Sequence, residues 1–155
     1  MKKYLMIFML SALILSCQQK SPTFLDSLKI TELDGQPIVP KSLEGKVVIL
    51  NLWATWCKPC IAEMPSLDIL QSKLPPDKFV LLLASDESPE RIKTFKQKGN
   101  FNLEFIKLES SLESLGVFAL PTTLFIDKEG KHSHTESGGK DWGTAESVQE
   151  ILNLY

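Results

Sequence analysis

Hydrophobic residues follow two spacings along the chain, and the strand-like spacing marks the centre of a sheet. Residues 46–53 (KVVILNLW) and 78–84 (KFVLLLA) are apolar at nearly every position, which is typical of strands buried on both faces. Residues 28–33 alternate and meet the turn signal Asp34-Gly35, which predicts an N-terminal hairpin with residues 37–39 as its returning strand. Shorter strands are predicted at residues 103–108, 122–126 and 131–135.

Helical spacing fills the gaps between these strands. After the first buried strand, apolar side chains recur every three or four residues, at Ile61, Met64, Leu67, Leu70 and Leu74. Ser88-Pro89-Glu90 is a helix start, residues 110–115 predict a short helix that Gly116 ends, and a last helix begins at Thr144. The order, a hairpin followed by β-α-β-α-β-α-β-β-α, predicts an α/β fold with a mixed sheet covered by helices on both faces.

Composition limits the classes of function. The chain has 155 residues, which is enough for one globular domain with its own core. Its formal net charge is −2 and it has no run of basic residues, so nucleic-acid binding through a basic face has no support.

The first residues have the pattern of an export signal. Lys2 and Lys3 precede an apolar stretch over residues 4–15 that is shorter than the ~20 residues a membrane-spanning helix needs. Residues 14–17 (ILSC) resemble the lipobox of bacterial lipoproteins, in which the cysteine is lipidated. We therefore expect a signal peptide at residues 1–16, a lipidated Cys17 and polar tether at 17–23, and one domain at 24–155. The alternative is an ordinary signal or an uncleaved anchor, with Cys17 incidental.

Residues 51–65 (NLWATWCKPCIAEMP) place two cysteines where a strand ends and a helix begins. A helix N-terminus stabilises a thiolate, so Cys57 is expected to be the accessible, acidic, attacking thiol, with Cys60 one turn further along as the resolving thiol. A structural disulfide across so short a loop adds only ~2 kcal/mol of stability. Structural zinc needs four ligands, which His132 and His134 would complete only if they share one strand face. A redox pair is therefore the favoured interpretation, and we predict no metal at this site.

The same stretch, together with residues 118–130 (FALPTTLFIDKEG), closely resembles the TlpA/ResA-like group of thioredoxin-fold proteins. The resemblance runs from about Phe24 to the C-terminus. It implies a thioredoxin-like fold and a membrane-tethered, extracytoplasmic thiol-disulfide oxidoreductase that uses no cofactor. The implied partners are protein disulfides and an upstream membrane dithiol donor, and the chain is expected to be a monomer.

The resemblance also implies roles for individual residues. Pro121 matches the cis-proline of the family, which leaves the backbone of Leu120 free to pair with an extended substrate. The alternative is a trans proline at the start of a strand. Trp56 resembles the tryptophan that shields the attacking thiol, and Trp53 the one packed beneath it; either could be an ordinary core aromatic.

Glu63 lies three residues after Cys60, on the same helix face. In the family this glutamate modulates the cysteines, because a carboxylate opposes thiolate formation and can accept the proton of the resolving thiol. An exposed helix glutamate without function is an equal alternative. Asn51 stands where ordinary thioredoxins carry a buried aspartate, which makes Glu63 the more important candidate for proton transfer.

The resulting hypothesis is reduction of partner disulfides through Cys57 and Cys60, with apocytochrome c a substrate suggested by the family alone. An oxidant or isomerase would use the same residues in the other direction. A copper- or zinc-binding lipoprotein is a further, non-catalytic alternative. A peroxidase is disfavoured, because Ala54 and Leu50 stand where threonine or serine and proline would be needed.

Overall fold

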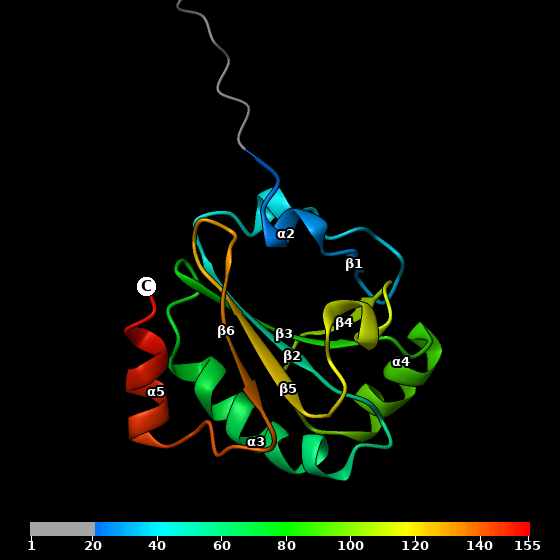
Figure 1. Ribbon diagram of the computed structural model, residues 1–155. Coiled ribbons are helices and arrows are strands. Elements are labelled where there is room, and N and C mark those ends of the chain that lie inside the picture. The colour runs from blue at the N-terminus through cyan, green and yellow to red at the C-terminus, as the bar shows by residue number, and fades with distance from the viewer. Residues whose placement is uncertain (1–20) are drawn as a thin grey trace, which may run out of the picture.

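The computed structural model describes residues 21–155, and its centre is a six-stranded sheet in the order β1-β4-β3-β2-β5-β6 (Figure 1). The strands are β1 Ile30–Thr31, β2 Val47–Leu52, β3 Phe79–Ser85, β4 Phe105–Leu108, β5 Thr122–Ile126 and β6 His132–Ser137. Strand β3 is parallel to β2 and to β4, whereas the β2–β5, β5–β6 and β1–β4 pairs are antiparallel. The predicted mixed sheet is confirmed.

Strand β2 lies at the centre because its sequence allows burial on both faces. All six of its residues are buried, including Asn51. It pairs with β3 over its whole length on one side and with β5 on the other. A nearly continuous apolar run therefore predicted the right strand and its burial on both faces.

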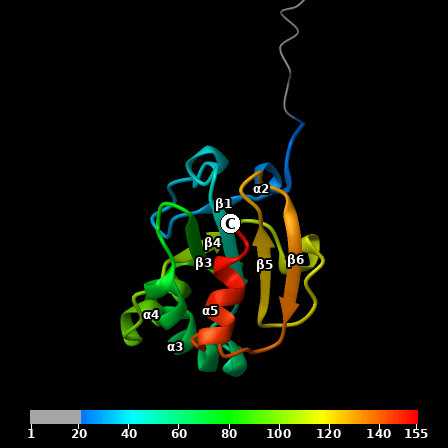
Figure 2. The same ribbon diagram turned by 90° about the vertical axis from the view of Figure 1, so that its left-hand side faces the viewer.

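Three helices cover one face of the sheet: α3 Lys58–Lys73, α4 Pro89–Lys98 and α5 Ala145–Leu152 (Figure 2). Their apolar residues share one core cluster with Trp53 of the loop after β2. The predicted helix starts are confirmed, since Ser88 and Thr144 are the N-caps of α4 and α5. Each cap side chain accepts a backbone N–H, which satisfies a donor that the helix itself leaves unpaired.

Within the described residues, the opposite face carries short helical turns alone, α2 Phe24–Ser27, η2 Pro40–Ser42 and η3 Leu112–Leu115. Helix α2 begins with a capping box in which Thr23 and Asp26 bond each other's backbone. The N-terminal segment thus closes the second core cluster over β2, β3, β4 and β5. Helices do lie on both faces, as predicted, but the long ones all lie on one.

The predicted N-terminal hairpin is present in a reduced form. Strand β1 has two residues, and the returning strand is a single bridge between Thr31 and Pro37. Two further backbone bonds close the turn, Glu32 N–H to Gln36 over 2.8 Å and Ile38 N–H to Ile30 over 3.0 Å. Because β1 also pairs with β4, the hairpin forms one edge of the main sheet.

The predicted signal peptide and Cys17 lie outside the described residues. Of the segment predicted to be a tether, the structure describes residues 21–23, where Thr23 already caps α2. Over residues 21–155, no helix has the length and apolar character needed to cross a membrane.

Candidate active site

A disulfide joins Cys57 to Cys60 at the start of α3, with the two Cα atoms 5.3 Å apart. Cys57 is the N-cap residue, and its Sγ accepts the backbone N–H of Cys60 over 3.2 Å. Pro59 occupies the first turn, where a missing N–H costs no helical hydrogen bond. The strand-to-helix junction therefore places Cys57 in the positive field of the helix end, where a thiolate is stabilised.

Both sulfurs are covered in this disulfide form. Cys57 is 3% exposed and Cys60 is 1% exposed, so the expectation of an accessible Cys57 is wrong for the oxidised pair. The reason is geometric, because the Cys57 sulfur turns inward to its partner and to a backbone N–H of the helix. The exposed group next to the pair is instead Trp56, at 69%.

The two tryptophans around the site have different environments. Trp56 is solvent-exposed, whereas Trp53 is fully buried. The Trp53 ring packs against Phe95 of α4 and Phe105 of β4, with ring centroids 4.7 and 5.2 Å away. Trp53 is thus a core aromatic beneath the site, and Trp56 belongs to its surface.

The Leu120–Pro121 peptide bond is cis, so the alternative of a trans proline is wrong. Pro121 directly precedes β5, whose first residue, Thr122, pairs with Leu52 at the end of β2. The proline and the disulfide therefore lie at the same end of the two central strands β2 and β5. The backbone of Leu120 makes no hydrogen bond with any other residue in the range 21–155.

Glu63 is 5% exposed, which excludes the alternative of an exposed helix glutamate. Its carboxylate accepts three N–H groups, from Asn51 Nδ2 at 2.9 Å, Trp142 Nε1 at 3.1 Å and the Lys140 amide at 3.2 Å. Burial raises the pKa of Glu63 above its ordinary value, and these three hydrogen bonds oppose that rise without cancelling it.

No cationic side chain is among these partners. The ammonium group of Lys140 binds the carboxylate of Glu150 at 3.0 Å, so only the backbone of Lys140 reaches Glu63. Asn51, which cannot ionise, gives its second amide hydrogen to Thr123 Oγ1 over 2.9 Å. Glu63 is the one carboxylate buried in the part of the chain that the structure describes, and it lies on the helix of the cysteines.

Sequence reasoning missed Trp142. Trp142 lies in the segment between β6 and α5, outside any helix or strand, and its side chain is fully buried. No periodic pattern surrounds it, since its neighbours are glycine, aspartate and lysine. The lone tryptophan in a polar segment was the available signal, but its partner is 79 positions away.

A second missed contact anchors the loop in front of the disulfide. Glu87, after β3, accepts both the backbone N–H of Thr55 at 2.6 Å and its hydroxyl at 2.9 Å. The Glu87 side chain is 9% exposed and also lies 3.4 Å from Arg91. This two-point contact fixes the residue next to Trp56, two positions before Cys57.

The two histidines do not share a strand face. A β-bulge between the pairs of Phe125 and Ile126 aligns Phe125 with His134 and the next residue, Ile126, with His132. His134 therefore stacks on Phe125 with centroids 4.2 Å apart, while His132 packs against Phe24 on the opposite face. The alternative of a zinc site completed by His132 and His134 required both side chains on one strand face, and this arrangement is not found.

A cysteine pair at the start of a helix, beside a cis-proline on a mixed sheet, defines a thioredoxin-like thiol-disulfide oxidoreductase. Residues 18–134 match the AhpC/TSA family. The thiol-disulfide oxidoreductase ResA of Bacillus thuringiensis subsp. konkukian is 35% identical over 138 residues, covering 86% of this chain and 75% of that relative. The chain therefore belongs to the AhpC/TSA family and, within it, with the ResA-type thiol-disulfide oxidoreductases.

Solved structures agree with this assignment. The exposed lipoprotein thioredoxin Etrx1 of Streptococcus pneumoniae superposes with a TM-score of 0.68 at 29% identity, over 82% of this chain and 98% of that one. The dsbF protein of MTB shares the fold, with a TM-score of 0.70 at 21% identity over 87% of this chain and 100% of that one. The predicted thioredoxin-like fold and enzyme class are confirmed.

Proposed function

We propose that this enzyme is a lipid-anchored reductant of protein disulfides outside the cytoplasm. The observation that carries the proposal is the position of the Cys57–Cys60 pair at the N-terminus of α3. The pair lies at the same end of the central strands as Leu120, whose backbone has no hydrogen-bond partner among the described residues. An extended substrate segment can pair with that backbone as an added strand.

The reaction transfers two electrons from the reduced pair to the partner. The Cys57 thiolate attacks one sulfur of the partner's disulfide, a mixed disulfide forms, and the partner's other sulfur leaves and takes up a proton. The Cys60 thiol then loses its proton and attacks Cys57 Sγ, which forms the Cys57–Cys60 bond and releases the second partner sulfur as a thiol. A membrane dithiol donor returns the pair to its reduced form.

Glu63 is the proposed acceptor of the Cys60 proton. It lies one helical turn after Cys60, and its burial raises its pKa, which brings its proton affinity closer to that of a thiol. The raised pKa also implies that a charged Glu63 is poorly stabilised, so gaining a proton from Cys60 relieves a buried charge.

Two observations support the location. Residues 14–17 have the lipobox pattern that would lipidate Cys17, and Etrx1, a structural neighbour, is described as an exposed lipoprotein. Disulfides persist outside the cytoplasm, where a reductant has substrates; haem-binding cysteines of apocytochrome c are one class that fits. Replacing Cys17 by Ala should move the protein from the membrane fraction to the soluble fraction.

The experiment for the catalytic cycle is trapping. A Cys60→Ser variant lacks the resolving thiol, so partner proteins should accumulate as mixed disulfides with Cys57 that dithiothreitol releases. A Cys57→Ser variant is the matched control and should trap far less. The absence of adducts with both variants would contradict the cycle.

The direction of electron flow is tested by the reduction potential. A reductant should have a potential near or below that of thioredoxin, about −270 mV, whereas an oxidant should approach about −120 mV. Equilibration with glutathione or dithiothreitol, followed by alkylation and mass measurement, gives the value. A potential near the upper figure would favour the oxidant alternative.

A further inference from the structure

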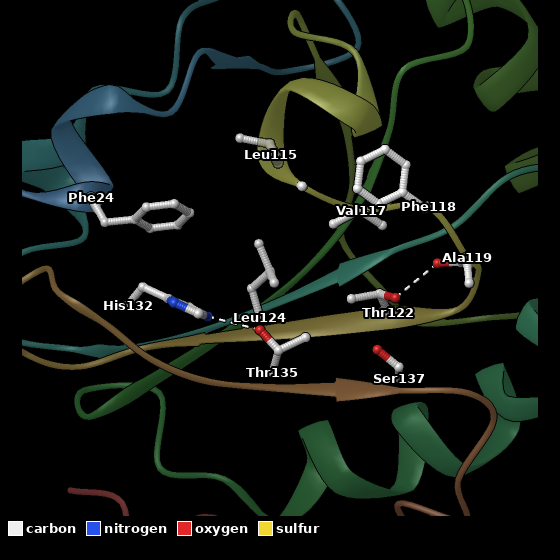
Figure 3. Close-up of a pocket in the computed structure, with 11 residues that line it drawn as sticks. Phe24, Leu115, Val117, Phe118, Ala119, Thr122, Leu124, His132, Thr135 and Ser137 are labelled. Atoms are coloured by element: carbon white, nitrogen blue, oxygen red, sulfur yellow. Dashed lines mark hydrogen bonds between the residues drawn. The ribbon is translucent and has the colours of Figure 1, made fainter.

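A cavity of about 320 Å³ lies on the thinly covered face of the sheet and reaches the cis-proline segment. Its floor is formed by β5 and β6, and its walls by α2 and the chain between η3 and β5 (Figure 3). Ala119 and Thr122, which flank Leu120 and Pro121, both line it. The cavity therefore begins where an extended substrate is proposed to pair and continues along β5, away from the disulfide.

The walls are mainly apolar. Leu124 points up from the floor, with Phe24 on one side of it and Val117 on the other (Figure 3). Phe118 stands at the rim and is 84% exposed, the highest value among the large hydrophobic side chains that the structure describes. Exposed aromatic side chains beside a concave apolar surface are typical of sites that bind another chain.

Polar groups that line the cavity form hydrogen bonds with one another, and the apolar walls take no part in these bonds. Thr122 donates its hydroxyl to Ala119 over 2.8 Å, and the hydroxyl of Thr135 lies 2.9 Å from His132 Nε2. These groups satisfy one another along the floor. An incoming side chain therefore meets hydrocarbon from Leu115, Val117 and Leu124 without having to displace these hydrogen bonds.

We infer that this cavity binds a large apolar side chain of the substrate polypeptide, close in sequence to the cysteine under attack. Phe118, at the rim, contacts the same side chain. The inference rests on the proposed function, because it takes the substrate to be an extended protein segment. We choose a substrate segment as the occupant because the cavity is continuous with the cis-proline segment. Ala119 and Thr122 line the cavity, and a polypeptide bound to Cys57 must pass next to them.

Strand geometry supports this choice. Side chains of an extended segment alternate between its two faces, so residues two apart point the same way at a spacing of roughly 6.5 Å. A segment paired with Leu120 therefore directs alternate side chains toward the Phe118 side. The specificity expected is for disulfides flanked, within three residues, by an aromatic or long aliphatic residue.

The test uses short synthetic peptides that contain one cysteine in mixed disulfide with thionitrobenzoate, so that reaction with the reduced enzyme releases a coloured thiol. One peptide has serine at each flanking position, and the others carry a single Phe within three residues of the cysteine. We expect one Phe position to raise the second-order rate constant about tenfold, which corresponds to ~1.4 kcal/mol. An increase below threefold at every position would overturn the inference.

Two variants locate the effect. Phe118→Ala removes the rim aromatic, and Ser137→Phe fills the cavity from an exposed position on β6; both should bring the ratio of Phe to Ser peptides toward one. Ser72→Phe makes the same change on the exposed surface of α3 and should leave the ratio unchanged. A ratio that persists in Ser137→Phe would place the contact elsewhere and overturn the inference.

A small disulfide separates this inference from the proposed function. Dithiobis(nitrobenzoate) is too short to reach from Cys57 along β5, so its rate should be the same in all three variants. A reduced enzyme that reacts with neither this reagent nor any peptide would contradict the proposed function itself. A normal rate with the small disulfide and no preference among peptides would overturn the cavity assignment alone.

Discussion

The indole of Trp142 donates a hydrogen bond to the Glu63 carboxylate over 3.1 Å and joins two residues that are 79 positions apart. The segment between β6 and α5 is thereby tied to the helix that carries the cysteines. The backbone N–H of Lys140 adds a second tie to the same oxygen at 3.2 Å. The buried carboxylate is thus held by neutral donors, and its pKa depends on them.

Replacing Trp142 by Phe should raise the pKa of Glu63 further. The indole N–H stabilises the ionised carboxylate, and a hydrogen bond to a charged group is worth ~1.5 kcal/mol or more, so its loss makes Glu63 harder to ionise. The carboxyl carbon of ¹³C-labelled glutamate, followed through a pH titration by NMR, gives the shift directly. Glu63→Gln assigns the signal.

Trp53→Phe is the matched control for that change. Trp53 is also fully buried, but its Nε1 has no hydrogen-bond partner among the described residues. The substitution removes a similar volume without removing a donor from Glu63. An equal pKa shift in both variants would show that repacking, and not the hydrogen bond, sets the pKa.

The pH dependence of stability should carry the sign of the raised pKa. A carboxyl that is harder to ionise when folded stabilises the protein fully at pH values below its unfolded pKa of 4.5, and this contribution is lost as pH rises through the higher folded pKa. The free energy of unfolding of the unmodified protein, minus that of Glu63→Gln, should therefore fall between pH 4 and pH 8. Urea unfolding at both pH values measures it; a difference that grows with pH would contradict the prediction.

Replacing Glu87 by Ala should loosen the loop before the disulfide. Both contacts to Thr55 would be lost, and hydrogen bonds to a charged, largely buried group contribute ~1.5–3 kcal/mol. Thr55→Val keeps the backbone contact and should cost about 1 kcal/mol. Glu129→Ala, at an exposed turn, is the control and should stay within about 0.5 kcal/mol of the unmodified protein in denaturant unfolding.

Gly130→Ala should destabilise the protein more than Gly138→Ala. Both glycines have positive φ, +80° and +93°, so the backbone strain of an alanine is similar. A methyl group at Gly130 would meet Thr23 Oγ1 at 2.7 Å and so push against the start of α2, whereas Gly138 has no atom within 4 Å of that position. Thermal unfolding of the two variants compares them; equal losses would show that α2 yields without cost.

The fold could be predicted because short stretches of sequence are enough to identify its main helices and strands. The apolar run of β2 and the Ser88 cap of α4 each depend on neighbouring residues only. The reduced hairpin and the separation of His132 from His134 could not be predicted in the same way. A bulge shifts the pairing by one residue and turns a side chain to the other face, and nothing in the sequence of β6 marks where it falls.

The site was predicted as far as its residues are adjacent in sequence. Cys57, Cys60 and Pro121 are recognisable from short stretches, whereas the environment of Glu63 depends on Asn51, Lys140 and Trp142, which tertiary packing brings together. The burial of Cys57 was missed for a related reason. A helix N-terminus indicates the electrostatics of a thiol but not which way its sulfur turns once it is bonded.

The position of α2 has a consequence for how the enzyme reaches its partners. The Leu25 amide binds Gly130 at the turn between β5 and β6, at the end of β5 opposite to Pro121. The described chain thus enters at one end of the domain, and the start of α3 lies at the other end, as Figure 1 shows. The disulfide lies at that start of α3. If the N-terminus is fixed to a bilayer, the end of the domain that carries the disulfide faces away from the lipid. A large folded partner protein can then bind there without contact with the membrane surface.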